Sequence, residues 1–286
     1  MIPLQISDLK KTFGTVVACD NVNITLKEGE IFGFIGPNGA GKTTTINSVI
    51  GLVKPNNGDI SLFGEDARNH ILRKDIGFAG GEASFFPQLT VFENLKFVAD
   101  VKGVPYDRID HYASILELSL SQKAKNLSLG NKRKLNLAAA LLSSPKLIIM
   151  DEPTEGIDPL VKQKLINLLE EEKKRGASIF ISSHSLSDVQ RLCDRVAIIK
   201  NGKIIAVEEM EQLKLKRLKI IKMETRYSTP QITLSGVSNV EQQERYIKFS
   251  YNGEMKKLVN YLNSVDIENV EITDSDLETM FLHFYE

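Results

Sequence analysis

The sequence contains no tryptophan and only two cysteines among its 286 residues. Cys19 and Cys193 lie far apart and form no CxxC motif, so a disulfide framework or a cysteine zinc site has little support. This scarcity fits a reducing cytosolic location. Net charge is nearly absent as well, because 36 Lys and Arg residues balance 37 Asp and Glu residues. We therefore expect no nucleic-acid partner that binds through charge.

Long apolar runs are also missing from the chain. No run approaches the roughly 18 to 20 residues that cross a bilayer, so a membrane role would require a partner and this chain would be peripheral. The N-terminal MIPLQISDLKK has no pattern of a secretory signal, and we expect the mature chain to begin there. At roughly 150 residues per domain, 286 residues suggest about two globular domains.

Two kinds of strand are expected in the first two thirds of the chain. Alternating apolar and polar residues predict half-buried antiparallel strands around Leu4 and Ile6, Val22 to Leu26, and Ile60 and Leu62. Unbroken apolar runs predict buried parallel strands over residues 31–35, 147–150 and 178–182. The first of these runs leads through a glycine loop into a helical pattern that starts at Thr43. The fold class is therefore α/β.

Helix signals follow at two further places. Thr90 and Glu93 form a capping-box pattern, which predicts a helical insert over about residues 84–145. Asp158 and Pro159 are typical of a helix start, and Gly176 after three basic residues is typical of a helix end.

A change in composition after Ala206 predicts a domain boundary. We expect a first domain over residues 1–211 and a small α+β domain over residues 212–286. The second domain is predicted to contain strands over 219–223, 246–251 and 270–273, a helix around Leu258 and a last helix over 277–284.

The segment GPNGAGKT, after the first apolar strand, matches the phosphate-loop pattern and predicts a nucleotide site. Backbone N–H groups of such a loop and of the following helix face phosphate oxygens. Lys42 would neutralise the terminal phosphates of the nucleotide, and the Thr43 hydroxyl would bind Mg²⁺. The residues expected to contact the nucleotide are Gly36, Pro37, Asn38, Gly39, Ala40, Gly41, Lys42, Thr43 and Thr44.

The apolar strand of LIIMDEP ends in two adjacent carboxylates. Asp151 is expected to hold Mg²⁺, and Glu152 to orient or deprotonate the attacking water. An isolated Asp-Glu pair after a strand is more often a helix cap. The phosphate loop favours the catalytic interpretation here.

Two further elements complete a family pattern, namely LSLGNKRKL at residues 127–135 and His184 after the third apolar strand. With them, residues 1 to about 210 resemble the ATP-binding cassette of ABC transporters. The resemblance implies a P-loop NTPase fold with a parallel core sheet, an antiparallel β subdomain and a helical subdomain. It also implies a second cassette as partner, which binds head to tail, and a multi-spanning membrane permease at whose cytoplasmic face this chain would lie.

The same resemblance assigns roles to individual residues. Ser128 and Gly130 would contact, in trans, the γ-phosphate that the partner cassette holds, and Asp158 belongs to the loop at the dimer contact. His184 occupies the family position that contacts the γ-phosphate in cis, where it would act with Glu152. Phe13 occupies the position where family members stack an aromatic ring on adenine.

Three positions depart from the family pattern: Leu129 replaces a glycine, Lys134 an arginine, and Gly81 the glutamine that bridges Mg²⁺, attacking water and permease. Either Glu82 makes the glutamine's contact, or the site works with water alone and isolated hydrolysis is slow. We favour the second possibility, because a carboxylate there would repel Glu152 and the γ-phosphate.

Three functions compete at this stage. The first is the ATP-hydrolysing subunit of a transporter, and the C-terminal segment DLETMFLHFYE resembles the extension of the bacterial drug, peptide and antibiotic export branch. The second is a soluble ABC ATPase of repair or translation, which would need a coiled-coil insert or two cassettes. The third is a regulatory cassette that binds ATP without hydrolysis, for which Gly81 is the only indication.

Overall fold

A mostly parallel sheet forms the centre of the first of two compact units, Met1–Met210 and Glu211–Glu286. The computed structural model describes residues 1–81, 85–215, 218–227 and 232–275. The sheet has the strand order β10-β9-β3-β8-β7-β6, in which only β10 runs antiparallel to its neighbour. The strands are β3 (Ile31–Ile35), β6 (Ile76–Ala79), β7 (Leu147–Asp151), β8 (Ser178–Ser183), β9 (Arg195–Lys200) and β10 (Lys203–Glu209).

The predicted antiparallel strands form a separate sheet with the order β2-β1-β4-β5. Its strands are β1 (Leu4–Phe13), β2 (Val16–Leu26), β4 (Asn57–Leu62) and β5 (Glu65–Asp66). Leu4 pairs with Leu26 on one side and with Leu62 on the other, and all three side chains are buried. They share one apolar core with the central sheet and with α1 (Lys42–Val49), so both sheets support the loop that precedes α1.

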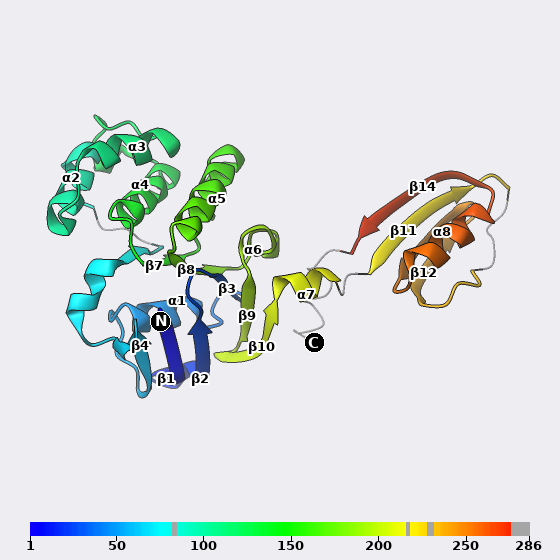
Figure 1. Cartoon of the computed structure of the whole chain (residues 1–286), viewed down its shortest axis with the longest axis horizontal. Coiled ribbons are helices and arrows are strands. Elements are labelled where there is room, and N and C mark those ends of the chain that lie inside the picture. Colours follow the sequence, from blue (N-terminus) through cyan, green and yellow to red (C-terminus); the bar gives the residue numbers. More distant parts are fainter. Residues whose placement is uncertain (82–84, 216–217, 228–231, 276–286) are drawn as a thin grey trace. The chain divides into compact units, whose positions relative to one another are not determined.

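Helices α2 (Val91–Lys102), α3 (Asp107–Ile115) and α4 (Leu129–Leu141) gather on the side of the first unit away from the antiparallel sheet (Figure 1). The predicted capping box is present, since the Thr90 hydroxyl accepts from the Glu93 N–H and the Glu93 carboxylate accepts from the Thr90 N–H. Short 3-10 turns at His70–Asp75 and Ala124–Asn126 precede β6 and α4. The expected combination of a parallel core sheet, an antiparallel β subdomain and a helical subdomain is present.

Helix α5 (Pro159–Lys174) begins and ends where the sequence signals predict. The Asp158 carboxylate caps it by accepting from the Val161 N–H at 2.9 Å. Gly176 follows with a φ of +96°, a backbone conformation that favours glycine. One face of the helix, with Val161, Leu165, Leu168 and Leu169, is buried, and α6 (Leu186–Leu192) then leads into β9.

The second unit is a four-stranded antiparallel sheet with one helix. The strand order is β12-β13-β11-β14, with β11 (Lys219–Thr225), β12 (Val237–Gln243), β13 (Tyr246–Tyr251) and β14 (Ile267–Asp274). Helix α8 (Met255–Asn263) packs Leu258 against one face, while Met255 and Val259 are exposed. Helix α7 (Met210–Leu215) spans the division between the units, and the expected last helix lies outside the described residues.

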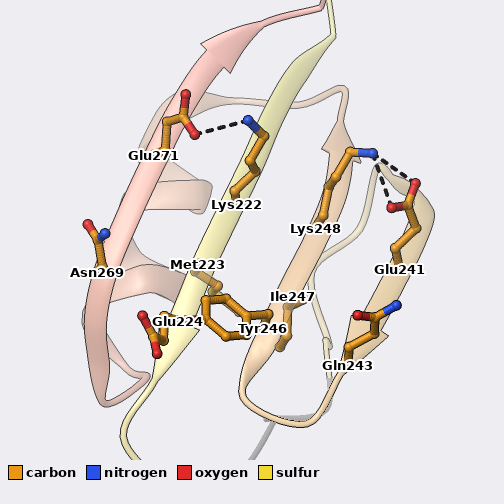
Figure 2. Close-up of a pocket in the computed structure, with 10 residues that line it drawn as sticks. All are labelled: Lys222, Met223, Glu224, Glu241, Gln243, Tyr246, Ile247, Lys248, Asn269 and Glu271. Carbon is orange, nitrogen blue, oxygen red and sulfur yellow. Dashed lines mark hydrogen bonds and ion pairs between the residues drawn. The ribbon is translucent and has the colours of Figure 1, made fainter.

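The other face of this sheet is polar (Figure 2). Lys222 pairs with Glu271 on the neighbouring strand at 3.0 Å, and Lys248 pairs with Glu241 at 2.9 Å. Strand β12 was not predicted, because its residues VSNVEQQ are nearly all exposed and lack an apolar alternation.

We predict that the first unit folds without the second, because it contains its own apolar core. A chain truncated after Gln212 is expected to bind ATP and to unfold cooperatively in circular dichroism. A second truncation after Leu215 keeps α7 whole, together with the buried Leu213, and controls for damage to that helix. If both products are insoluble or unfolded, the two units share one folding core.

Candidate nucleotide-binding site

The predicted phosphate loop connects β3 to α1. A Cβ atom at Gly41 would lie 2.2 Å from the Ala18 carbonyl oxygen, which is too close for any side chain. The φ of Gly41, +109°, also favours glycine. The Lys42 ammonium donates to the carbonyl oxygens of Gly36 at 2.6 Å and of Pro37 at 3.2 Å. The Lys42 side chain is only 6% exposed, so its charge lies inside the curve of the loop.

The exposed turn of the loop consists of Pro37, Asn38 and Gly39. Ala40 is buried behind this turn, and its carbonyl oxygen accepts from the Gly202 N–H at 3.0 Å. Thr44 lies half-buried in the first turn of α1. The loop is therefore held from behind by the connection between β9 and β10 and leaves its outer turn accessible.

Asp151 is the last residue of β7 and lies beside Thr43, in the first turn of α1. Its carboxylate accepts from the Thr43 hydroxyl at 2.7 Å and, through its other oxygen, from the Ser182 hydroxyl. Asp151 and Ser182 are direct neighbours in the parallel pairing of β7 with β8. The pairing of these strands thus brings Asp151 to the helix that carries Lys42 and Thr43.

Glu152 lies between Lys42 and His184. Its Oε2 atom accepts from the His184 backbone N–H at 3.1 Å and lies 2.9 Å from the His184 Nδ1 atom. Its Oε1 atom lies 3.2 Å from the Lys42 ammonium nitrogen, at an angle outside hydrogen-bond geometry, so this buried oxygen has an ion-pair partner but no hydrogen bond from the described residues. Glu152 also has a φ of +50°, which is unusual for a residue other than glycine.

The donor set at this point fits Mg²⁺. Mg²⁺ is usually held by one or two protein oxygens together with waters and phosphate oxygens. Thr43 and Asp151 offer one hydroxyl and one carboxylate that already lie within hydrogen-bond distance. In the described part of the chain no three His, Cys, Asp or Glu side chains gather as a metal cluster, so an ion here would need the phosphates as further ligands.

The predicted trans residues lie elsewhere in the cassette. Ser128 caps α4 by accepting from the Asn131 N–H at 3.2 Å, and Leu129 beside it is 66% exposed. A Cβ atom at Gly130 would lie 3.1 Å from the Gly156 carbonyl oxygen, so this helix start faces the loop that follows β7. In the described structure the hydrogen bonds of the Ser128 side chain stay within α4. The structure therefore brings Lys42, Thr43, Asp151, Glu152 and His184 together, whereas Ser128 and Gly130 make no hydrogen bond to them among the described residues.

Asp158 makes two interactions at the start of α5. Its carboxylate accepts a hydrogen bond from the Val161 N–H and lies 3.3 Å from the Lys134 ammonium. The hydrogen bond from Val161, and to a lesser extent the charge of Lys134, keep the pKa of the Asp158 carboxyl below its ordinary value. Phe13 lies at the end of β1, is half exposed and has the Lys11 ammonium 4.9 Å from its ring centre.

Gly81 lies near Asp151 and Glu152, with which it lines a small cavity. It follows β6, which pairs in parallel with β7, and Ala79 is opposite Met150. A Cβ atom at Gly81 would have no heavy atom of the described residues within 4 Å, so these residues leave room for a side chain there. Glu82, the alternative contact considered above, lies outside the described residues.

Sequence reasoning missed Ser182 as a site residue. Its hydroxyl donates to Asp151 and accepts from the Glu152 N–H at 3.0 Å, so one side chain orients both carboxylate residues. The available signal was its place at the carboxyl end of an apolar strand, where parallel neighbours meet.

Comparison with known proteins agrees with this geometry. The ABC transporter family model matches residues 19–155. The bacitracin transport ATP-binding protein BcrA of Bacillus licheniformis is 35% identical over 98% of this chain and 96% of its own length. The chain belongs to the ATP-binding subunits of ABC transporters.

Two other members of the ABC family match a shorter part of this subunit. The lantibiotic transport ATP-binding protein SrtF of Streptococcus pyogenes is 39% identical over 210 residues, which cover 73% of this ABC subunit and 91% of SrtF. A solved structure, described as the ATP-binding subunit of an ABC transporter, has a TM-score of 0.67 and 30% identity over 75% of this chain and 92% of its own. The 210-residue match has the length of the first unit, whereas the BcrA match includes the second.

No helix in the described ranges is long and apolar enough to cross a membrane.

We predict that Ser182→Ala destabilises the first unit by about 1 to 3 kcal/mol, because the buried Asp151 oxygen and the Glu152 N–H both lose a partner. Thermal unfolding of the variant would measure the loss. Ser121→Ala at an exposed position serves as the control and should leave the unfolding temperature unchanged. An equal unfolding temperature for Ser182→Ala and wild type would contradict the role given to this hydroxyl.

Proposed function

We propose that this chain hydrolyses Mg²⁺-ATP and uses the energy to drive export through a separate permease. The observation that carries the proposal is Glu152, a carboxylate held between the Lys42 ammonium and His184 at the end of β7. A site that only bound nucleotide would need the phosphate loop but not this carboxylate.

Each residue has a chemical task in this proposal. Lys42 neutralises the β- and γ-phosphates, and the phosphate loop with the start of α1 donates backbone N–H groups to them. Thr43 and Asp151 would hold Mg²⁺, which would supply positive charge to the phosphate oxygens. Glu152 accepts a hydrogen bond or a proton from the attacking water, and His184 orients the Glu152 carboxylate through Nδ1 and its backbone N–H.

The second ATP-contacting surface is proposed to come from a partner cassette. Ser128 caps a helix whose N-terminal end would present N–H groups to the partner's γ-phosphate, together with Gly130. Asp158 lies in the neighbouring loop and pairs with Lys134 of the same helix, so both segments would meet the partner as one surface. Phe13 is half exposed, as a ring that stacks on adenine requires.

Export is proposed from what two of the relatives are named for. BcrA and SrtF are named for transport of bacitracin and of a lantibiotic, and the BcrA match extends through the second unit of this chain. The exposed, edge-to-face pair of Phe86 and Phe97 on the helical side offers an apolar contact for the permease, with this subunit bound at the cytoplasmic face.

We expect Glu152→Gln to bind ATP and to accumulate a closed dimer, because the amide keeps the shape but cannot accept a proton from water. Steady-state hydrolysis should fall by about 100-fold or more, as is typical when a general base is lost. Size-exclusion chromatography with Mg²⁺-ATP would measure the dimer. Lys42→Ala is the contrasting variant, since it should weaken nucleotide binding itself. A monomer for Glu152→Gln at high concentration, both alone and with a co-expressed second cassette, would remove the support for the head-to-tail dimer.

We expect the isolated chain to hydrolyse ATP slowly and the permease to stimulate it, because Gly81 offers no side chain to orient water. Gly81→Gln should raise the hydrolysis rate of the isolated chain several-fold, because a glutamine side chain that orients the water would lower the activation free energy by on the order of 1 kcal/mol. The described residues leave space for this side chain. Rates with and without the permease in detergent or liposomes test this. A fast isolated wild-type rate that Gly81→Gln does not increase would argue against it.

A further inference from the structure

Helix α4 lies directly against β6, and a glycine permits the approach. A Cβ atom at Gly77 would be 2.1 Å from the Ala140 carbonyl oxygen, so a larger residue would push the strand and the helix apart. The helix that begins after Ser128 is therefore fixed beside the strand that leads to Gly80 and Gly81.

Asn136, one turn before Ala140 on α4, bonds to the end of this strand. Its Nδ2 atom donates to the Gly80 carbonyl oxygen at 2.6 Å, and its side chain is 9% exposed between the buried Leu135 and Leu137. Asparagine is a weak helix former, and a buried amide without a partner costs free energy. The bond to Gly80 offsets that cost and ties the loop to the helix.

The same helix also holds the loop that follows β7. The Arg133 guanidinium donates to the Glu155 carbonyl oxygen and lies 2.8 Å from the Glu155 carboxylate. Lys134 pairs with Asp158 at 3.3 Å. Side chains of α4 thus reach both loops beside the end of β7, where Asn136 and Arg133 help to line a small cavity with Gly80, Gly81, Asp151 and Glu152.

We propose that Asn136 is a positioning residue for ATP hydrolysis, which holds Gly80 and Gly81 beside Glu152. The proposal rests on the hydrolytic function given above. Gly81 has no side chain that could hold it in place, so the Asn136 side-chain amide holds the loop through its hydrogen bond to the Gly80 carbonyl oxygen. Ser128 caps the start of α4, and Asn136 of the same helix bonds to Gly80. A movement of Ser128 on contact with the partner's ATP would therefore be transmitted to the loop through one helix and one hydrogen bond.

The decisive variant is Asn136→Asp in the full chain. Aspartate has nearly the same size, but its carboxylate cannot donate to the Gly80 carbonyl oxygen and repels it. We expect kcat to fall about tenfold while KM for ATP changes less than about twofold, because positioning is lost and the phosphate contacts remain. Asn136→Ala, which removes the donor without adding charge, should give a smaller fall in kcat with the same constancy of KM.

Tyr112→Phe provides the matched control. It removes a buried hydrogen bond to Glu172, 3.0 Å long, that joins α3 to α5 without contact to Gly80. The control should lower the unfolding temperature and leave kcat unchanged. The inference is overturned if both Asn136 variants keep the wild-type kcat, if KM rises as much as kcat falls, or if Tyr112→Phe lowers kcat equally. Absence of hydrolysis by wild type with its permease would instead defeat the proposed function.

Discussion

The parallel pairing of β3, β8 and β7 is the constraint on which the nucleotide site depends. Parallel strands end at the same edge of a sheet, so residues distant in sequence meet there. Asp151 is paired with Ser182, and Ile35, just before the phosphate loop, is paired with Ser183. A shift of one residue in the pairing of β7 with β8 would turn the Asp151 carboxylate to the opposite face, away from the Thr43 hydroxyl. The apolar strands therefore determine the distances between the polar groups.

The same edge explains why three loops act as one unit. The loops after β3, β6 and β7 leave neighbouring parts of the sheet, and each is held by a contact from another element: Gly202 behind Ala40, Asn136 at Gly80, and Arg133 at Glu155. Two of these contacts come from α4. Loops fixed in this way need little rearrangement to reach a reactive geometry, which reduces the entropic cost of orienting water.

Much of this arrangement could be predicted from the sequence, and the reasons are local. Unbroken apolar runs identified β3, β7 and β8, and the capping signals at Thr90 and Asp158 identified helix starts, because these patterns depend on nearby residues. Strand β6 was missed because four residues carry too short a pattern, and β12 because its side chains are exposed. The roles of Ser182 and Asn136 depend on contacts across 31 and 56 residues, which no local pattern contains.

The backbone of Glu152 has a consequence for the evolution of this site. A φ of +50° is strained for glutamate, at a cost of about 1 kcal/mol, and glycine or asparagine would adopt it more easily. Replacement of Glu152 by either residue would therefore relax the main chain while it removed the carboxylate beside Lys42 and His184. Screens that select only for thermal stability should then enrich glycine or asparagine at this position. Retention of the glutamate in such a screen would require selection for transport.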